Sequence, residues 1–334
     1  MSYTNAMIKR ILEYYTRYYL VGIVVCTVIA YSFPAPFDKF GSYVIGTLGG
    51  DFFKLTTNKL FFSLTMFGIG AVLKLDDFVH IAKNPLVILI GTCAQFTIMP
   101  LGAYLFTKLF HLDADLAIGL ILTGCAPGAM TSNVMCYLAR ADTAYSVSLT
   151  TISTLLCPVL TPVLLQFLVG SQLDVSFIQQ FFGLFVTVVL PLLLGVLLRH
   201  WLKETMERFL PIFPAISVTF IIFICAYVIA RNKSRLSELS IALFATIVCL
   251  NIYGMAAGYG VGRCFGFLTQ RYRTLSIEIG MQNAGLGVIL ATTLAQEGKA
   301  SDLVTLPPVL FVFICIITAS GMAAFWQKNE RGKI

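Results

Sequence analysis

Charged residues are scarce in this chain, and their scarcity limits what the protein can be. Of its 334 residues, 12% are Asp, Glu, Lys or Arg, whereas 58% are hydrophobic. Soluble domains carry about 25% charged residues, so this chain could not cover a water-exposed surface. Intrinsic disorder is excluded as well, because disordered segments are poor in apolar side chains. The composition therefore predicts an integral membrane protein with little mass outside the bilayer.

The sequence also lacks the motifs of common enzymes. It contains three His residues and no HExxH, Walker, dinucleotide-binding or nucleophile-elbow motif. Its nine Cys residues form no CxxC pair and have no zinc-type spacing. The net charge of +7 comes from short segments between apolar runs, which indicates membrane topology rather than nucleic-acid binding. These absences argue against an enzyme, a zinc centre and ATP-driven transport.

Ten apolar runs are candidates for transmembrane helices, each of which needs about 20 residues. They cover residues 18–33, 60–75, 85–106, 115–139, 144–169, 177–198, 209–230, 239–267, 275–295 and 303–326. With the N-terminus inside, most of the 23 Lys and Arg residues fall on the cytoplasmic side, as expected of cytoplasmic loops. We therefore predict a multi-pass protein whose tails, residues 1–17 and 327–334, are both cytoplasmic.

The fourth and ninth spans are the most unusual, and they take corresponding places if the ten spans form two halves of five. Pro127 and Gly128 favour a helix break in the fourth span, and Thr131, Ser132 and Asn133 follow it. A simple proline kink is the alternative, but the dense polar cluster argues against it. Paired interruptions in corresponding spans are typical of a transporter's binding site.

Glu278 is an acidic residue inside the ninth apolar span. A carboxylate there costs several kcal/mol unless it is paired or protonated. Its expected partner is a bound cation, a proton or a water-filled cavity, because no basic residue lies near mid-depth. Gln282 shares its helix face, and Asn283 with two nearby glycines allows a second helix break. The alternative places Glu278 near the cytoplasmic end, solvated beside Arg271 and Arg273.

Three further polar side chains inside apolar spans are candidate ligands: Gln95 in the third span, and Ser146 and Thr150 at i, i+4 in the fifth. Alone, such residues usually bond a neighbouring helix or their own backbone. As oxygen donors opposite a carboxylate, the two hydroxyls suit a sodium ion.

Three stretches carry a resemblance to a known family. They are CAPGAMTSNVMCYLARADTAYSVSLTTISTLLCPVLTPVL (125–164), SIEIGMQNAGL (276–286) and FGIGAVLKLDDF (67–78). They resemble the bile acid:sodium symporter family, in particular its bacterial ten-helix members. The resemblance implies an all-α integral membrane protein of ten transmembrane helices in two inverted five-helix repeats. It also implies a panel domain (18–75 and 177–230) and a core domain (85–169 and 239–326) in which the fourth and ninth spans unwind and cross.

The resemblance further implies two sodium sites behind the crossing and a substrate site in front of it. The first sodium site would use Ser132, Asn133, Ser146, Thr150 and Glu278. The second would use Gln95, Glu278 and Gln282 with the carbonyls of Ile279 and Met281. The substrate would bind between panel and core, near Pro127, Gly128, Met130, Thr131, Asn283 and Thr318. Many bacterial relatives carry a His-Asn pair in the tenth span, where this chain has Ile317 and Thr318.

We therefore expect a secondary active transporter that couples sodium entry, with two Na+, to uptake of a small organic anion by alternating access. A bile acid or a pantoate-like carboxylate are both compatible substrates. The alternative is a proton-coupled or exchange carrier on the same fold, similar to arsenite exporters, and a third class is a receptor, channel or intramembrane enzyme. The expected setting is the bacterial inner membrane, as a monomer with no nucleic-acid partner.

Overall fold

The computed structural model describes residues 19–50, 52–73, 85–170, 176–210, 212–238 and 240–331. The predicted tail 1–17, the end of the tail 327–334 and residues 74–78 of the FGIGAVLKLDDF motif lie outside the described residues. The chain divides into two compact units, Met1–Leu75 with Phe182–Ser237 and Asp76–Phe181 with Glu238–Ile334. Their assignment as panel and core domains stays a prediction.

The first unit consists mainly of helices. They are α2 (Tyr19–Ser32), α3 (Pro34–Ser42), α4 (Thr57–Val72), the π-helix η2 (Phe185–Val189), α11 (Leu190–Phe209), α12 (Ile212–Arg231) and the 3-10 helix η3 (Lys233–Glu238), and α10 (Phe177–Leu184) leads into η2. The axes of α2 and α3 differ by 104°. Pro34 explains this bend, because proline has no backbone N–H and cannot continue the preceding helix.

The first unit also contains an antiparallel hairpin that the sequence analysis did not predict, formed by β1 (Val44–Leu48) and β2 (Phe53–Thr56). Gly49 and Gly50 both adopt positive φ, 63° and 70°, in the turn between the strands, a conformation that glycine adopts without strain. Thr56 then caps α4, because its hydroxyl accepts a hydrogen bond from the Lys59 backbone N–H at 3.4 Å. The prediction of a purely helical chain is therefore wrong for these two strands.

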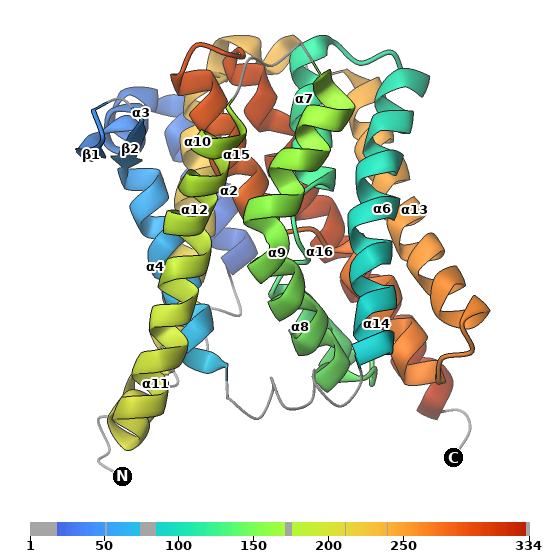
Figure 1. Ribbon diagram of the computed structural model, residues 1–334. Helices are drawn as coiled ribbons and strands as arrows, with labels where there is room; N and C mark the ends of the chain where they lie inside the picture. The colour runs from blue at the N-terminus through green and yellow to red at the C-terminus, as the bar shows by residue number, and fades with distance from the viewer. Residues whose placement is uncertain are drawn as a thin grey trace. The chain divides into compact units, whose positions relative to one another are not determined.

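The regular elements among the described residues of the second unit are all helices (Figure 1). Its elements are α6 (Pro85–Leu109), α7 (Ala114–Gly124), α8 (Thr131–Leu138), α9 (Thr143–Val169), α13 (Ile241–Cys264), α14 (Thr269–Gly280), α15 (Ala284–Gln296), the 3-10 helix η4 (Asp302–Thr305) and α16 (Leu306–Arg331). Helix α6 packs against α7, α9 and α13, and α14 packs against α8, α9 and α13. Both interrupted spans are thus held within one unit.

Helices lie within all ten predicted ranges in the described part of the chain. Five helices there are long and apolar enough to cross a membrane: Pro85–Leu109, Thr143–Val169, Phe177–Leu202, Ile241–Cys264 and Asp302–Lys328. The bent pair formed by α2 and α3 makes a sixth if it counts as one span. The arrangement of ten spans in two inverted repeats stays a prediction.

Both predicted interruptions are confirmed. The fourth span is divided into α7, which ends at Gly124, and α8, which begins at Thr131. The ninth span is divided into α14, which ends at Gly280, and α15, which begins at Ala284. The proline that the sequence analysis singled out in the fourth span lies inside the first of these breaks.

Gly254, Gly258 and Gly262 lie at four-residue spacing on α13 and allow close helix packing. A Cβ atom on Gly258 would lie 2.5 Å from the carbonyl oxygen of Leu275, which belongs to α14. Small residues allow such close approach between helix backbones. Helix α13 therefore supports α14 directly behind the segment that carries Glu278.

Candidate functional site

The two breaks pair with each other through their backbones. Gly128 and Gln282 form an isolated antiparallel β-bridge. The Ala129 N–H donates to the Met281 carbonyl at 2.8 Å, and the Asn283 N–H donates to the Pro127 carbonyl at 2.8 Å. Breaking a helix leaves backbone donors and acceptors without intrahelical partners, which is costly away from water. The crossing satisfies part of this demand and fixes the two breaks side by side.

A side chain from a neighbouring helix donates to one carbonyl at the end of α7 and another to one carbonyl at the end of α14. The Thr161 hydroxyl of α9 donates to the Cys125 carbonyl at 2.7 Å. The Asn251 side-chain N–H2 of α13 donates to the Gly280 carbonyl at 2.8 Å. The sequence analysis missed both residues, although a buried Asn inside the apolar stretch of α13 is a signal that could have identified one of them.

Three hydroxyl groups surround the carboxylate of Glu278, whose side chain is only 2% exposed. We call Ser132, Ser146 and Thr150 the hydroxyl cluster. The Ser132 hydroxyl lies 2.5 Å from Glu278 Oε1, and the Ser146 hydroxyl donates to the same oxygen. The Thr150 hydroxyl lies 3.1 Å from Oε1 and 3.0 Å from Oε2. Side chains from α8, α9 and α14 therefore converge on one carboxylate.

The alternative interpretation of Glu278, a solvated residue beside Arg271, is wrong. Glu278 is buried, whereas Arg271 forms an ion pair with Asp142, with 3.2 Å between Nε and Oδ2. Asp142 also accepts a hydrogen bond from the Tyr145 N–H, so it caps the start of α9. This ion pair fixes the start of α14 against the start of α9, two turns from the carboxylate.

The hydroxyl cluster holds more acceptors than its protons can satisfy. Ser132 Oγ lies 2.6 Å from the Ala129 carbonyl oxygen. Ser146 Oγ lies 2.7 Å from Asn133 Oδ1, and Thr150 Oγ1 lies 2.9 Å from the Ser146 carbonyl oxygen. Because each hydroxyl has one proton, three hydroxyls cannot serve both these oxygens and the carboxylate. The surplus of oxygen lone pairs around one negative charge is the environment that a hard cation requires.

The residues of the second predicted ligand set also lie together, but several of their oxygens are engaged in hydrogen bonds within the protein. Gln95 of α6 donates through Nε2 to Gln282 Oε1 at 2.9 Å. Gln282 donates through Nε2 to the Ile279 carbonyl at 2.9 Å. The Met281 carbonyl accepts the Ala129 N–H of the crossing. In this geometry three oxygens of the predicted set each already accept a hydrogen bond.

Residues 59–239, over half of the chain, match the model of the sodium bile acid symporter family. The chain belongs to this family. The resemblance inferred from the three motifs is thereby confirmed. This symporter-family chain is a multi-pass membrane protein and not an enzyme.

Several proteins similar to this chain are named as transporters. YocS of Bacillus subtilis, named as an uncharacterised sodium-dependent transporter, is 32% identical over 98% of this chain and 96% of its own length. The chloroplastic protein BASS1 of Arabidopsis thaliana, named as a probable sodium/metabolite cotransporter, is 33% identical over 80% of this chain and 66% of its own length. BASS2 of Oryza sativa, with the same kind of name, is 30% identical over 96% of this chain and 73% of its own length.

The predicted substrate residues of this symporter-family chain fall into two groups. Pro127, Gly128 and Asn283 lie at the crossing, and Met130 and Thr131 follow at the start of α8. The Asn283 side chain caps α15 by accepting the Leu286 N–H at 3.1 Å. Thr318 lies on α16, and its hydroxyl donates to carbonyls of its own helix, those of Ile314 and Cys315. The structure thus brings the first five residues together and leaves Thr318 as a separate prediction.

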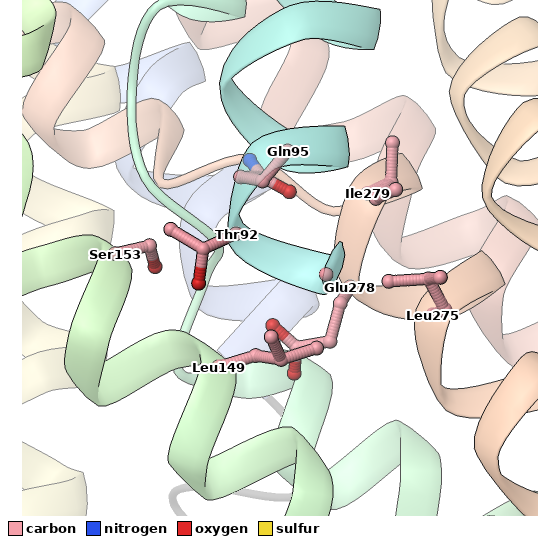
Figure 2. Close-up of a pocket in the computed structure, with 8 residues that line it drawn as sticks. Thr92, Gln95, Leu149, Ser153, Leu275, Glu278 and Ile279 are labelled. Carbon is pink, nitrogen blue, oxygen red and sulfur yellow. The ribbon is translucent and has the colours of Figure 1, made fainter. Parts of the chain in front are cut away.

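A small cavity in the protein lies beside Glu278 (Figure 2). It has room for about one water-sized occupant. Gln95, Glu278 and Ile279, all from the second predicted ligand set, line it. Thr92 and Ser153 line it as well, and the sequence analysis named neither of them. The cavity therefore coincides only in part with the predicted second site.

Proposed function

We propose that this chain is a secondary active transporter that carries a small organic anion inward with two sodium ions per cycle, by alternating access. The observation that supports it most is the buried Glu278 carboxylate in an oxygen-rich, proton-poor cluster. A buried carboxylate is costly unless a positive charge compensates it. A bound sodium ion supplies that charge, and the family is one of sodium-dependent transporters.

The chemical groups around Glu278 favour a monovalent ion. Glu278 is the one carboxylate among these contacts, and the other groups are neutral hydroxyls and an amide. Within the described residues, no group of three or more His, Cys, Asp or Glu side chains could hold a metal ion. Divalent ions are usually held by several charged ligands, whereas one carboxylate with neutral oxygens matches a single positive charge.

The proposed substrate is an organic anion such as a bile acid or a pantoate-like carboxylate. Helices α8 and α15 both begin at the crossing, and the dipole of a helix attracts anions to its N-terminus. Unwound helices with their N-termini at a substrate site are typical of sodium-coupled transporters. The proposal includes a monomer in the bacterial inner membrane with both termini in the cytoplasm.

The proposal is tested first without any substrate. Purified protein is unfolded thermally in sodium chloride and in potassium chloride at equal ionic strength. We expect selective stabilisation by sodium, because a ligand that binds the folded state at 100 times its Kd stabilises it by about 2.7 kcal/mol.

Equal unfolding temperatures in the two salts would contradict sodium binding. A stabilisation that instead follows pH and ignores sodium would favour a proton-coupled or exchange carrier on the same fold. Glu278 would then hold a proton in place of a cation.

Gly128→Ala is expected to weaken sodium binding without unfolding the protein. A Cβ atom at residue 128 would lie 2.7 Å from Glu278 Oε2, so the carboxylate must move away from the crossing. Displacing a metal ligand by changing its support costs about 10- to 100-fold in affinity. We therefore expect the half-saturating sodium concentration, measured by thermal unfolding, to rise at least about tenfold.

Gly260→Ala is the matched control, because nothing lies within 4 Å of the Cβ atom that it adds. It should leave the sodium response unchanged. An unaltered sodium response in Gly128→Ala would mean that the carboxylate position does not determine cation affinity.

A further inference from the structure

The cavity beside Glu278 contains a buried hydroxyl without a partner. Thr92 of α6 is 6% exposed, and its Oγ1 has no hydrogen-bond partner. This is unusual, because threonine in a helix normally donates to its own backbone, as Thr107 of the same helix does to the Tyr104 carbonyl at 2.7 Å. Because Thr92 lines the cavity, an occupant of that cavity would supply the partner that its buried hydroxyl lacks.

The Thr92 hydroxyl and the carboxylate line the same space. Thr92 and Gln95 are three residues apart on α6, so they share a helix face, and both line the cavity. Figure 2 shows Thr92 between Ser153 and Glu278, with its hydroxyl oxygen turned toward the side on which Leu149 and Glu278 lie. The cavity therefore combines a free hydroxyl oxygen with a negative charge.

Ser153 adds a further oxygen. Its hydroxyl donates to the Thr150 carbonyl at 3.1 Å, which leaves its lone pairs available. The polar groups that α6, α9 and α14 contribute are thus mainly acceptors next to an anion. Such a lining suits a cation better than a neutral water molecule, because water would satisfy hydrogen bonds but not the charge.

We propose that the Thr92 hydroxyl oxygen is a further ligand of the sodium ion expected at the second predicted site, whose residues Gln95, Glu278 and Ile279 line the same cavity. The inference rests on the proposed sodium coupling and adds a ligand beyond the five groups that the resemblance implied. It also accounts for the bonding state of that set, in which the oxygens of Ile279, Met281 and Gln282 already accept hydrogen bonds. Thr92 Oγ1 is a cavity oxygen that has no hydrogen-bond partner at all.

The test compares Thr92→Val with wild type in thermal unfolding across a sodium titration, at constant ionic strength maintained with potassium. Valine keeps the shape and removes the hydroxyl. We expect the half-saturating sodium concentration to rise roughly three- to tenfold, the effect of losing one polar contact of ordinary net strength. Thr92→Ser, which keeps the hydroxyl, should retain the sodium affinity of wild type, and Thr92→Ala should lose it as valine does.

Thr107→Val is the matched control, since it removes a buried hydroxyl of α6 that bonds its own helix. A sodium titration of Thr92→Val that equals those of wild type and Thr107→Val would overturn the inference while leaving sodium coupling intact. An equal loss of stability in sodium and in potassium would overturn it as well, because it would identify a water bridge in place of a cation. A wild type that does not respond to sodium would overturn the proposed function and this inference together.

Discussion

Glu278→Gln is expected to abolish the selective stabilisation by sodium, a loss of about 2.7 kcal/mol at sodium concentrations 100 times Kd. Glutamine keeps the shape of the side chain and removes the charge that both proposed cation positions share. Its amide also adds two N–H donors to a cluster that has more acceptors than protons. The variant should therefore fold, and in potassium it should be at least as stable as wild type, because an uncompensated buried carboxylate is gone.

Glu297→Gln is the matched control for this change. Glu297 lies in the same unit and pairs with Lys299 at 2.8 Å on a partly exposed surface. It loses one carboxylate without touching the hydroxyl cluster, so its sodium response should equal that of wild type. If Glu278→Gln keeps the full sodium effect, the carboxylate is not a ligand of the bound sodium, and the proposed position of the cation is wrong.

The broken spans were predictable because their cause is local. Pro127 removes a backbone donor, and the polar residues that follow it make sense in an apolar span only near a binding site. The partner of each break was not predictable in the same way. The bridge between Gly128 and Gln282 joins segments far apart in the chain, and no spacing rule encodes it. Here the family resemblance supplied what local reasoning could not.

The same contrast applies to the candidate ligands. The i, i+4 spacing of Ser146 and Thr150 identifies them as candidate ligands, because it places both on one helix face. Thr92 has no such signal, since a threonine in an apolar helix is expected to bond its own backbone. Only the packing of α6 against α9 and α14 leaves its hydroxyl unpaired beside a carboxylate.

The hairpin was missed for a different reason. A Gly-Gly pair between two runs of mixed apolar residues is a hairpin signal, and Gly49 and Gly50 provide it. The strongly apolar composition favours membrane helices, and it does not distinguish a short hairpin before the second predicted span from a plain connection. Composition identifies the class of protein but does not exclude a small element of another class.

The largest functional effect expected of this chain is concentrative uptake driven by membrane potential. If two sodium ions enter with one monovalent anion, one net positive charge moves inward in each cycle. A tenfold sodium gradient supplies about 1.4 kcal/mol per ion, and 100 mV supplies about 2.3 kcal/mol per charge. The total of about 5 kcal/mol supports an accumulation of about 10³- to 10⁴-fold.

The measurement uses protein reconstituted into liposomes, with pantoate and a bile acid as the two probe anions. An inward sodium gradient should drive uptake, and a potassium diffusion potential, negative inside, should accelerate it and produce a substrate-evoked inward current. Glu278→Gln in the same liposomes provides the baseline, because it lacks the carboxylate on which both cation positions depend. Uptake that needs sodium but is indifferent to the potential would replace the two-sodium stoichiometry with an electroneutral one. Uptake driven by a pH gradient without sodium would instead make Glu278 a proton carrier. A protonated Glu278 is neutral, so the transport cycle could then run without a bound cation.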